Sequence, residues 1–501
     1  MISHSERQAA RQRVIEWLRG FNKKVTNRIT MRFAGKRVYA VVYHRGRKSG
    51  KDYQTPVVAM PTGDCFVFPL PYGAHTDWCR NLMAAGGGRM QWRGGFYALR
   101  SPRLIQPEEA VPAFPQWLRP LLRRTEVYLQ MERALQPDAR LRRVLVYGAG
   151  VLGSLYAGKL RQAGYDVTLL ARGQRLAELR ARGLILVDEA SDKREEIPVP
   201  VIDRLDPGNA YDLVLVVVRK NQIPTVLPAL AANRVTPNVL FLVNNAEGPG
   251  ALVEALGRER VLLGFPGAGG QRSAGEVRYM LASSAQPTTV GELDGQESER
   301  LWLIRQMFSD AGLPVTVCNN MDAWLKTHVA LVSPMANALY MAGGDNYRLA
   351  RTRDGVVLLV RAVKEGLRVL GALGIPVTPG RYRVLAALPE PLMVWILQKR
   401  LGQPQVELLA ARHANAARDE MTTLAAEFRA LARRSGVKTR AIDQLYAYTD
   451  ASVPPAPEGQ AEIKVAWGPT IAATGALLSL GLLAAWLLRK KPRGRRGSCC
   501  T

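Results

Sequence analysis

The chain has 501 residues, which is too long for one ordinary domain, so two or three domains are expected. Its formal net charge is +27, and residues 1–143 hold 26 Lys and Arg against 10 Asp and Glu. Such a charge attracts polyanions, but the sequence has no nucleic-acid-binding motif, so we expect a phosphorylated or carboxylated cofactor and a membrane surface rather than a nucleic acid.

The N-terminal stretch is polar and helical in pattern. Its first ten residues are polar and include charged ones, which argues against a secretory signal peptide, and residues 1–30 carry the apolar spacing of an N-terminal helix. The five cysteines follow neither a disulfide framework nor a metal-site spacing. We therefore expect a reducing compartment and no metal.

Residues 31–136 are predicted to form a small β module, a split β-barrel or sheet. Short strands separated by Gly and Pro turns are expected at 38–43, 54–60, 65–69, 90–92 and 96–101. Residues 107–136 are predicted to be a helical connector.

The pattern changes at residue 141. A buried strand at 143–147, a glycine turn, a helix at 152–162 and a strand at 166–170 predict a Rossmann domain over 141–318 with a parallel, doubly wound sheet. Apolar runs at 211–218 and 239–243 add further strands. Residues 319–450 have helical spacing throughout and predict an all-α domain. The expected fold class is multidomain α/β.

The C-terminal region is predicted to leave the folded body. Residues 451–466 contain a Pro-rich stretch typical of a linker. Residues 467–488 form a run of 22 without charge, with Trp467 and Trp486 near its ends, which predicts a transmembrane helix. Residues 489–501 are a basic tail.

The segment Gly148-Ala149-Gly150-Val151-Leu152-Gly153 follows a strand and opens a helix, the context that gives a GxGxxG motif its meaning. The glycines permit a tight turn and close approach to a pyrophosphate, which the backbone N–H groups at the helix N-terminus bind. An NAD enzyme usually has an acid at the end of the second strand, where this chain has Arg172. A cation there pairs with a 2′-phosphate, so NADPH is predicted over NADH.

Residues 143–172 resemble the N-terminal signature of the ketopantoate reductase family, and the resemblance covers about 310 residues, from about 141 to 450. The resemblance implies hydride transfer from NADPH to the carbonyl of a 2-keto acid. It assigns the catalytic lysine to Lys326, a nicotinamide-side asparagine to Asn244 and a late glutamate of the helical domain to Glu420. It also implies cofactor contacts from Arg219 and Gln222, with Arg219 in place of the usual lysine.

The chain departs from the family at three substrate positions. The family's asparagines four and eight residues after the lysine are Ala330 and Pro334 here, and the serine twelve residues before the glutamate is Leu408. A site that has lost hydrogen-bonding partners discriminates poorly for the original substrate. We therefore expect a larger or more apolar carbonyl substrate than 2-dehydropantoate.

The N-terminal module resembles the deazaflavin-dependent nitroreductase family over residues 30–110, through Arg45 to Lys51, Thr55-Pro56, Tyr72-Gly73 and Asp77-Trp78 with Asn81-Leu82. A Gly/Ser turn with three cations is a nest for phosphate or a glutamyl tail. The resemblance implies that a deazaflavin coenzyme, rather than FMN, binds here. The residues assigned to that site are Arg47, Lys48, Ser49, Lys51 and Tyr72.

The leading hypothesis is thus a fused oxidoreductase with an NADPH site and a deazaflavin site, anchored in a membrane with its catalytic domains in the cytoplasm. A homodimer is compatible with it. The alternative hypothesis is a membrane-anchored dinucleotide-binding sensor or scaffold without turnover. The altered substrate positions favour this alternative, whereas Lys326 and Asn244 disfavour it.

Overall fold

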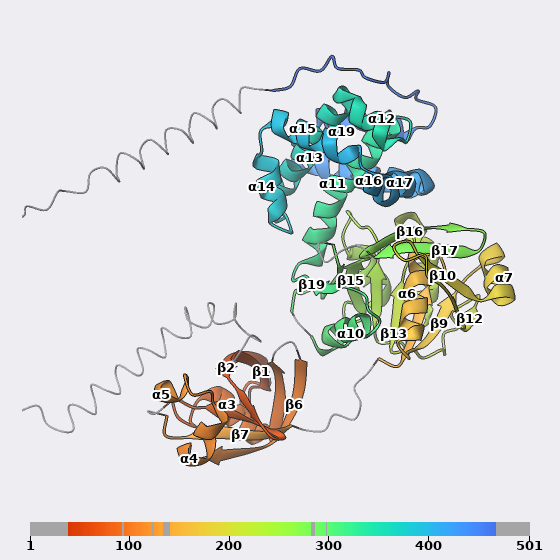
Figure 1. The fold of residues 1–501 in the computed structure, drawn as a ribbon. Coiled ribbons are helices and arrows are strands. Elements are labelled where there is room, and N and C mark those ends of the chain that lie inside the picture. The colour runs from red at the N-terminus through yellow and green to blue at the C-terminus, as the bar shows by residue number, and fades with distance from the viewer. Residues whose placement is uncertain are drawn as a thin grey trace, which may run out of the picture. The chain divides into compact units, whose positions relative to one another are not determined.

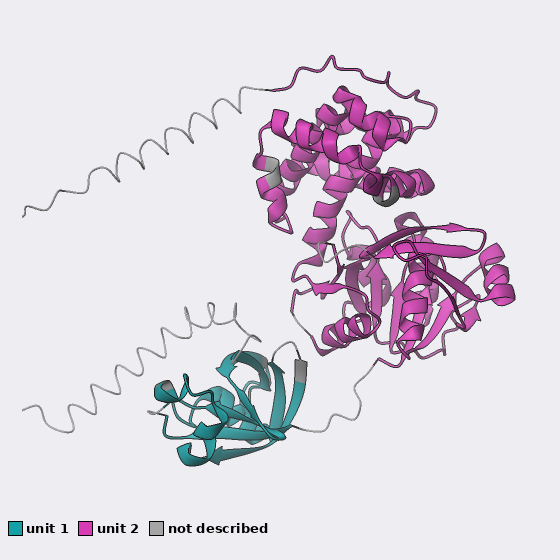
Figure 2. Cartoon of the chain, in the orientation of Figure 1, with its two compact units in different colours: residues 1–140 teal, residues 141–501 magenta. Residues whose placement is uncertain are grey.

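The computed structural model describes residues 39–92, 95–122, 125–133, 141–281, 286–296 and 298–466. They belong to two compact units, residues 1–140 and 141–501 (Figure 2). The predicted N-terminal helix, the apolar run 467–488 and the basic tail lie outside the described residues. Within those ranges, none of the helices combines the length and apolarity needed to cross a bilayer.

The first unit is built on an antiparallel sheet of seven strands in the order β2-β1-β5-β6-β7-β4-β3 (Figure 1). Its strands are β1 (Tyr39–Arg45), β2 (Asp52–Val58), β3 (Met60–Thr62), β4 (Cys65–Pro69), β5 (Gly87–Trp92), β6 (Gly95–Ile105) and β7 (Tyr128–Arg133). Helix α3 (Asp77–Ala85) packs Cys79 and Leu82 into the core. Among the described strands, β2 and β3 remain edges, so the sheet is open rather than a closed barrel.

The predicted helical connector at 107–136 is wrong over most of its length. Only α4 (Pro107–Ala110), the 3-10 turn η2 (Val111–Ala113) and α5 (Arg119–Leu122) are helical, and β7 joins the sheet between β6 and β4. The cause is that buried side chains alternate along this segment with a period of two residues. Leu129 and Met131 enter one core cluster, while Tyr128 enters the other. Alternating burial requires a strand, and this overrides helix propensity.

The second unit begins with an eight-stranded sheet in the order β12-β9-β8-β13-β14-β15-β18-β19, parallel except at the β15–β18 pair. Its strands are β8 (Arg143–Tyr147), β9 (Asp166–Leu170), β12 (Val201–Ile202), β13 (Leu213–Val216), β14 (Val239–Leu242), β15 (Val261–Phe265), β18 (Thr288–Gly291) and β19 (Val315–Val317). Helices cover both faces, namely α6 (Val151–Gln162), α7 (Gly173–Arg182), α8 (Ile223–Ala232), α9 (Gly250–Leu256) and α10 (Glu299–Asp310). Val144 and Val146 enter one core while Leu145 and Tyr147 enter the other, as a doubly wound sheet requires.

A second, four-stranded sheet was not predicted. It has the order β11-β10-β17-β16, with β10 (Leu184–Asp188), β11 (Arg194–Ile197), β16 (Ala268–Ser273) and β17 (Glu276–Leu281). Strands β10 and β17 come from segments about 90 residues apart, so only their tertiary pairing defines the sheet.

Residues 321–449 are helical, as expected. The elements are α11 (Met321–Met341), α12 (Asn346–Arg351), α13 (Arg353–Ala372), α14 (Arg381–Ala387), α15 (Glu390–Leu401), α16 (Pro404–Val406), the π-helix η4 (Glu407–Ala411), α17 (Arg412–Ala416), α18 (Arg418–Ser435), α19 (Arg440–Tyr446) and the 3-10 turn η5 (Ala447–Thr449). The long apolar helices α11 and α13 form the centre of one core, against which α15, α18 and α19 pack.

Residues 451–466, predicted to be a linker, instead lie along this helical domain (Figure 1). Asp354 is 1% exposed, and its carboxylate accepts the backbone N–H groups of Glu462 and Ile463 at 3.0 and 2.8 Å. Ala456 donates to the Met341 carbonyl at 2.9 Å, and Ala466 donates to Glu390 at 2.9 Å. We call residues 451–466 the strap, because hydrogen bonds between Ala456 and Ala466 hold it to the domain.

Candidate functional site

The glycine loop 148–153 joins β8 to α6 and has the geometry of a pyrophosphate cradle. Gly148 has a φ of +114°, and a Cβ there would lie 2.4 Å from the Val217 carbonyl oxygen. A Cβ on Gly153 would lie 1.8 Å from the Gly148 carbonyl oxygen. Around Gly150, by contrast, no atom lies within 4 Å of such a Cβ. Two glycines are thus required by the fold, and the third leaves open space at the N-terminus of α6, where a phosphate binds.

Arg172 lies beside this loop. It precedes α7, and its guanidinium donates to the Tyr147 hydroxyl at 2.7 Å. Burial raises the pKa of Tyr147 and the nearby Arg172 lowers it, so the phenol stays protonated at neutral pH. The described sequence places no carboxylate at the end of β9, where Leu170-Ala171-Arg172 stands.

Arg175 is a residue that the sequence analysis missed. It is 7% exposed and donates to the carbonyl oxygens of Ala149 and Gly275 at 3.3 and 3.0 Å, and to the Ser154 hydroxyl at 3.2 Å. It therefore holds the glycine loop against α7 and the second sheet. A lone arginine in a helix gives no signal of this role in a single sequence.

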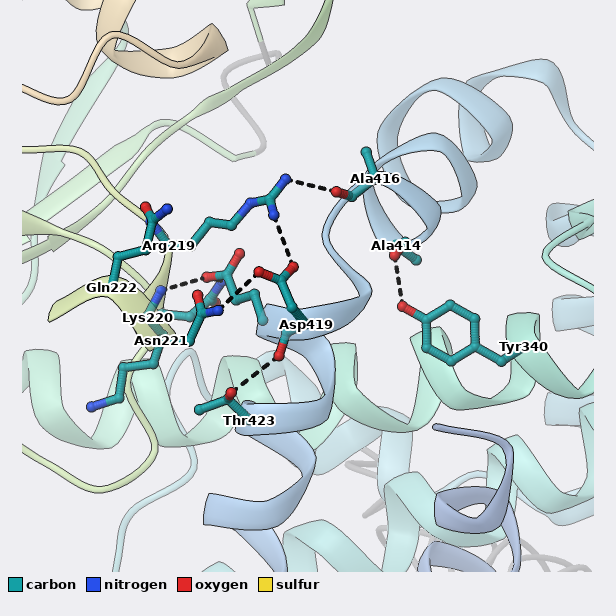
Figure 3. Close-up of polar contacts among 11 residues, drawn as sticks. Arg219, Lys220, Asn221, Gln222, Tyr340, Ala414, Ala416, Asp419 and Thr423 are labelled. Carbon is teal, nitrogen blue, oxygen red and sulfur yellow. Dashed lines mark hydrogen bonds and ion pairs between the residues drawn. The ribbon is translucent and has the colours of Figure 1, made fainter. Parts of the chain in front are cut away.

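The segment after β13 connects the two domains of this unit (Figure 3). Arg219 donates to Asp419 at 2.8 Å and to the Ala416 carbonyl at 2.6 Å, and Asn221 donates to Asp419 at 2.8 Å. The Gln222 side chain accepts the Arg219 backbone N–H at 3.2 Å, within the short helix η3 (Lys220–Gln222). Arg219 therefore joins β13 to α18, and cofactor contacts by Arg219 and Gln222 stay predictions.

Asn244 and Glu420, predicted separately, are brought together by the fold. Asn244 follows β14 and its amide nitrogen donates to Glu420 Oε1 at 3.2 Å, an oxygen that also accepts the Lys220 backbone N–H at 3.2 Å. Both side chains are buried. Asn244 Oδ1 is buried and has no hydrogen-bond partner among the described residues. A buried acceptor without a donor costs about 1–3 kcal/mol, and a donor from a ligand would remove this cost.

Lys326 of α11 lies next to Gly248, which is at the far end of the loop that starts at Asn244. It is 6% exposed, and its ammonium donates to Asp322, four residues earlier on α11. Gly248 has a φ of +102°, and a Cβ there would lie 3.2 Å from Lys326 Nζ. Asn245 holds this turn through Gly248, donating to its carbonyl at 2.8 Å and accepting its N–H at 3.0 Å. The loop thus links the Asn244–Glu420 pair to the Lys326 ammonium.

Glu427 supports the same loop from α18. Its carboxylate accepts the Ala246 N–H at 3.2 Å and pairs with Lys220 Nζ at 3.3 Å, and Lys220 also reaches Glu247 at 3.4 Å. Burial raises the pKa of Glu427, while Lys220 lowers it. Neither residue was predicted.

His328 packs between two large aromatic residues, Phe265 and Trp324. His328 lies 4.2 Å from Phe265 and 5.4 Å from Trp324 between ring centroids, and it is stacked on Trp324. Burial, with a smaller effect of His413, lowers the pKa of His328 to about 4, so its ring is neutral at pH 7. The pKa of His413 is also lowered by burial, is raised by Glu420 and is lowered by Arg219.

The altered family positions lie in packed surroundings. Ala330 is fully buried, and a Cβ on Gly366 of α13 would lie 3.2 Å from the Ala330 Cβ. Pro334 is buried inside α11. Two positions with polar residues in the family are therefore apolar contacts here. The structure describes no side-chain surroundings for Leu408.

In the first unit, the predicted cationic turn lies between β1 and β2. Arg47 donates to Asn81 at 2.8 Å and to Asp77 at 3.2 Å, while Asn81 also contacts His44 at 3.0 Å. Lys48, Ser49 and Lys51 are exposed, with Ser49 bonded to Tyr53 at 3.1 Å. Tyr72 is half-buried in the segment before α3. Arg47 thus orders the turn, and the two lysines present charge to solvent.

The chain's similarity to known proteins agrees with this geometry. Residues 144–295 match the family described as ketopantoate reductase PanE/ApbA. The 2-dehydropantoate 2-reductase of Halobacterium salinarum is 32% identical over 252 residues, covering 49% of this chain and 81% of the relative. That of Archaeoglobus fulgidus is 30% identical over 240 residues, covering 47% and 76%.

The fold of the second unit also matches a solved structure. The 2-dehydropantoate 2-reductase of Geobacter metallireducens aligns with a TM-score of 0.51 at 17% identity, over 62% of this chain and 100% of that chain. The chain belongs to the ketopantoate reductase family of oxidoreductases.

Proposed function

We propose that residues 141–450 transfer a hydride from NADPH to the carbonyl carbon of a 2-keto acid. The observation that carries this proposal is the Asn244–Glu420 pair with its unpartnered Oδ1, joined by the loop 244–248 to the buried ammonium of Lys326. This arrangement offers one acceptor toward a cofactor or substrate donor, and one proton donor next to Gly248 at the end of the same loop.

The residues present fit a dinucleotide, since Gly150 leaves open space at the N-terminus of α6 and Asn244 lacks a donor. The loop 148–153 would hold the pyrophosphate, and Arg172 the 2′-phosphate that distinguishes NADPH. The bound cofactor supplies the hydride. Lys326 donates a proton to the oxygen as the carbonyl becomes an alkoxide, so the product is a 2-hydroxy acid. Asp322 is a positioning residue that holds the ammonium.

The substrate we propose is larger or more apolar than 2-dehydropantoate. Ala330 and Pro334 offer no hydrogen bond, and Phe265, Trp324 and neutral His328 add an aromatic wall. Loss of hydrogen-bonding groups at these positions, together with the aromatic side chains, favours apolar ligand groups and leaves polar ones without partners.

Steady-state assays with NADPH and a panel of 2-keto acids test the proposal. The panel runs from 2-dehydropantoate to acids with branched aliphatic and aromatic side chains. The expected result is the highest kcat/KM for an apolar acid, lost in Lys326→Met. Tight NADPH binding without turnover of any acid would favour a dinucleotide-binding sensor or scaffold instead.

We propose in addition that the first unit binds a deazaflavin coenzyme. Support comes from the 45–51 turn, where Asp77 and Asn81 hold Arg47 while Lys48 and Lys51 present charge for an anionic tail. Titration of the full chain with a deazaflavin coenzyme and with FMN tests this proposal. Lys48→Gln with Lys51→Gln should weaken deazaflavin binding and leave NADPH affinity unchanged.

We also propose that residues 467–488 anchor the chain in a membrane with both catalytic units in the cytoplasm. The uncharged run of 22 residues supports this. Membrane fractionation after alkaline carbonate washing tests it, and release of the chain into the wash would contradict it.

A further inference from the structure

A large open cavity lies on the helical domain, and none of the redox-site residues described above lines it. Its volume is about 620 Å³. Its walls come from α13, from the segment after α13, from α14 and from the start of α15. The lining residues used below are Arg361, Lys364, Glu365, Arg368, Arg383 and Glu390.

The cavity has an uncompensated positive charge. Arg361 pairs with Glu390 at 2.9 Å, and Glu365 accepts the N–H groups of Ala441 and Ile442 at the start of α19. The carboxylates of Glu365 and Glu390, which line the cavity, therefore already have hydrogen-bond or ion-pair partners. Arg368 and Arg383 are exposed, and neither has an ion-pair partner among the described residues.

Lys364 adds to this field. Its ammonium donates to the Leu388 carbonyl at 2.5 Å, and no carboxylate lies within ion-pair distance of it among the described side chains. Its pKa is lowered by burial, raised by Glu390 and lowered by Arg368. The cavity therefore has the character of an anion site.

An exposed apolar surface adjoins the cavity. Val384 of α14 is 69% exposed, and Leu392 and Trp395 of α15 are 41% and 54% exposed. Leu392, Trp395 and Lys399 have i, i+3, i+7 spacing and share one helix face, with Lys399 Nζ 4.2 Å from the Trp395 ring centroid. Among the described residues of the second unit, Val235 is the one further large apolar side chain with comparable exposure.

The strap ends at this surface (Figure 1). Glu390, which lines the cavity, accepts the Ala466 N–H at 2.9 Å, and Arg361 donates to the Lys464 carbonyl at 2.7 Å. The uncharged run 467–488 starts at the next residue. The described fold therefore delivers the most apolar segment of the chain to the edge of the cationic cavity.

We propose that the α14–α15 surface, with this cavity, rests on an anionic lipid bilayer. Arg368 and Arg383 bind lipid phosphates, while Val384, Leu392 and Trp395 enter the interfacial layer. Exposed Trp and Leu beside Lys and Arg are the composition that favours a membrane interface. This inference uses none of the residues of the redox site, and it rests on the proposed membrane anchor at 467–488.

Hydrogen exchange of the full chain in lipid nanodiscs tests the proposal. The amides of α14 and α15 should be protected in phosphatidylcholine/phosphatidylglycerol discs relative to detergent. Arg368→Gln with Arg383→Gln should reduce this protection, by about fivefold for each cation removed. The matched control is Arg234→Gln with Arg258→Gln, two exposed arginines of the Rossmann domain without ion-pair partners among the described residues.

A second readout does not depend on amide exchange. Brominated lipid should quench tryptophan fluorescence less in Trp395→Phe than in the wild type. Equal quenching in the two proteins, or equal exchange of α14–α15 in discs and detergent, would overturn the proposal. Protection by inorganic phosphate alone, in detergent, would also overturn it, because the ligand would then be a free anion. Unchanged NADPH affinity in each variant would show that the fold is intact.

Discussion

At the scale of single residues, the proposed site depends on buried polar side chains that have hydrogen-bonding capacity left for a ligand. Asn244 donates to Glu420 and leaves its oxygen unpartnered, and Lys326 has Asp322 as its carboxylate partner. A ligand donor would satisfy the first atom and a carbonyl oxygen would accept from the second. These unmet contacts support the proposed roles of Asn244 in binding and of Lys326 in proton transfer.

Lys326→Met should lower kcat for the best keto acid by about 10²- to 10⁴-fold, because the alkoxide would lose its proton donor. NADPH affinity, measured by fluorescence titration, should change little. Lys326→Arg is the control for charge, since it keeps the cation but is a poor proton donor. Wild-type kcat in Lys326→Met would remove this lysine from catalysis.

Arg172→Gln should weaken NADPH binding by about 10- to 100-fold, because a hydrogen bond to a charged group contributes about 1.5–3 kcal/mol. NADH lacks the 2′-phosphate, so its Kd should be unchanged. Calorimetric titration with both cofactors checks this. An equal loss for NADPH and NADH would mean that Arg172 only supports the loop through Tyr147.

His328 should make stability fall at acidic pH. Its ordinary pKa is 6.5 and burial lowers the folded-state pKa to about 4, so the unfolded chain takes up the proton first. The stabilisation is present above pH 6.5 and is lost as the pH falls toward 4, by about 2 kcal/mol at about pH 5. Urea denaturation at about pH 7.5 and pH 5 should show a smaller loss in His328→Gln. Identical losses would exclude this histidine as the cause.

At the scale of elements, a glycine-to-alanine substitution should have different effects at two positions of the glycine loop, on stability at Gly153 and on cofactor binding at Gly150. Gly153→Ala puts a Cβ against a backbone carbonyl and should destabilise the Rossmann domain by more than about 2 kcal/mol. Gly150→Ala meets no atom, and Gly150 has a φ of −69°, so stability should be unchanged while NADPH affinity falls at least about tenfold. Thermal unfolding with cofactor titration checks the pair. Similar stability of the two variants would contradict the packing described for Gly153.

The sequence predicted those elements whose cause is local. The strand β8, the glycine turn and α6 follow from residues adjacent in sequence, and they are where they were predicted. Strand β7 was missed because its six residues, which alternate in burial with a period of two, fall within a segment that was predicted to be helical. The β10–β17 pair depends on partners about 90 residues apart, and Arg175 and Glu427 act through tertiary contacts, so no local pattern indicates them.

At the scale of the whole molecule, the strap changes how the C-terminal region is attached. A free linker would let residues 467–488 move independently of the catalytic domains, whereas the bonds to Asp354, Glu390 and Met341 fix where that run begins. With the proposed membrane anchor at 467–488, the strap would also set how the helical domain faces the bilayer.

Asp354→Ala should release the strap, because the Glu462 and Ile463 N–H groups lose a buried carboxylate acceptor. Limited proteolysis should cut within 451–466 at least about tenfold faster than in the wild type, while NADPH affinity is retained. Glu458→Ala, which removes a more exposed ion pair with Arg351, is the matched control and should have little effect. Equal cleavage rates in Asp354→Ala and the wild type would show that the carboxylate does not hold the strap.

The most direct test of hydride transfer in the second unit is isotopic. NADPH deuterated at C4 of the nicotinamide, incubated with the full chain and the best 2-keto acid, should give a 2-hydroxy acid with deuterium at C2. Mass spectrometry should find deuterated product with the wild type. Lys326→Arg should form the same deuterated product more slowly, and Lys326→Met should form none above background. A 2-hydroxy acid without deuterium, or no product from any keto acid despite bound NADPH, would contradict the proposed reaction.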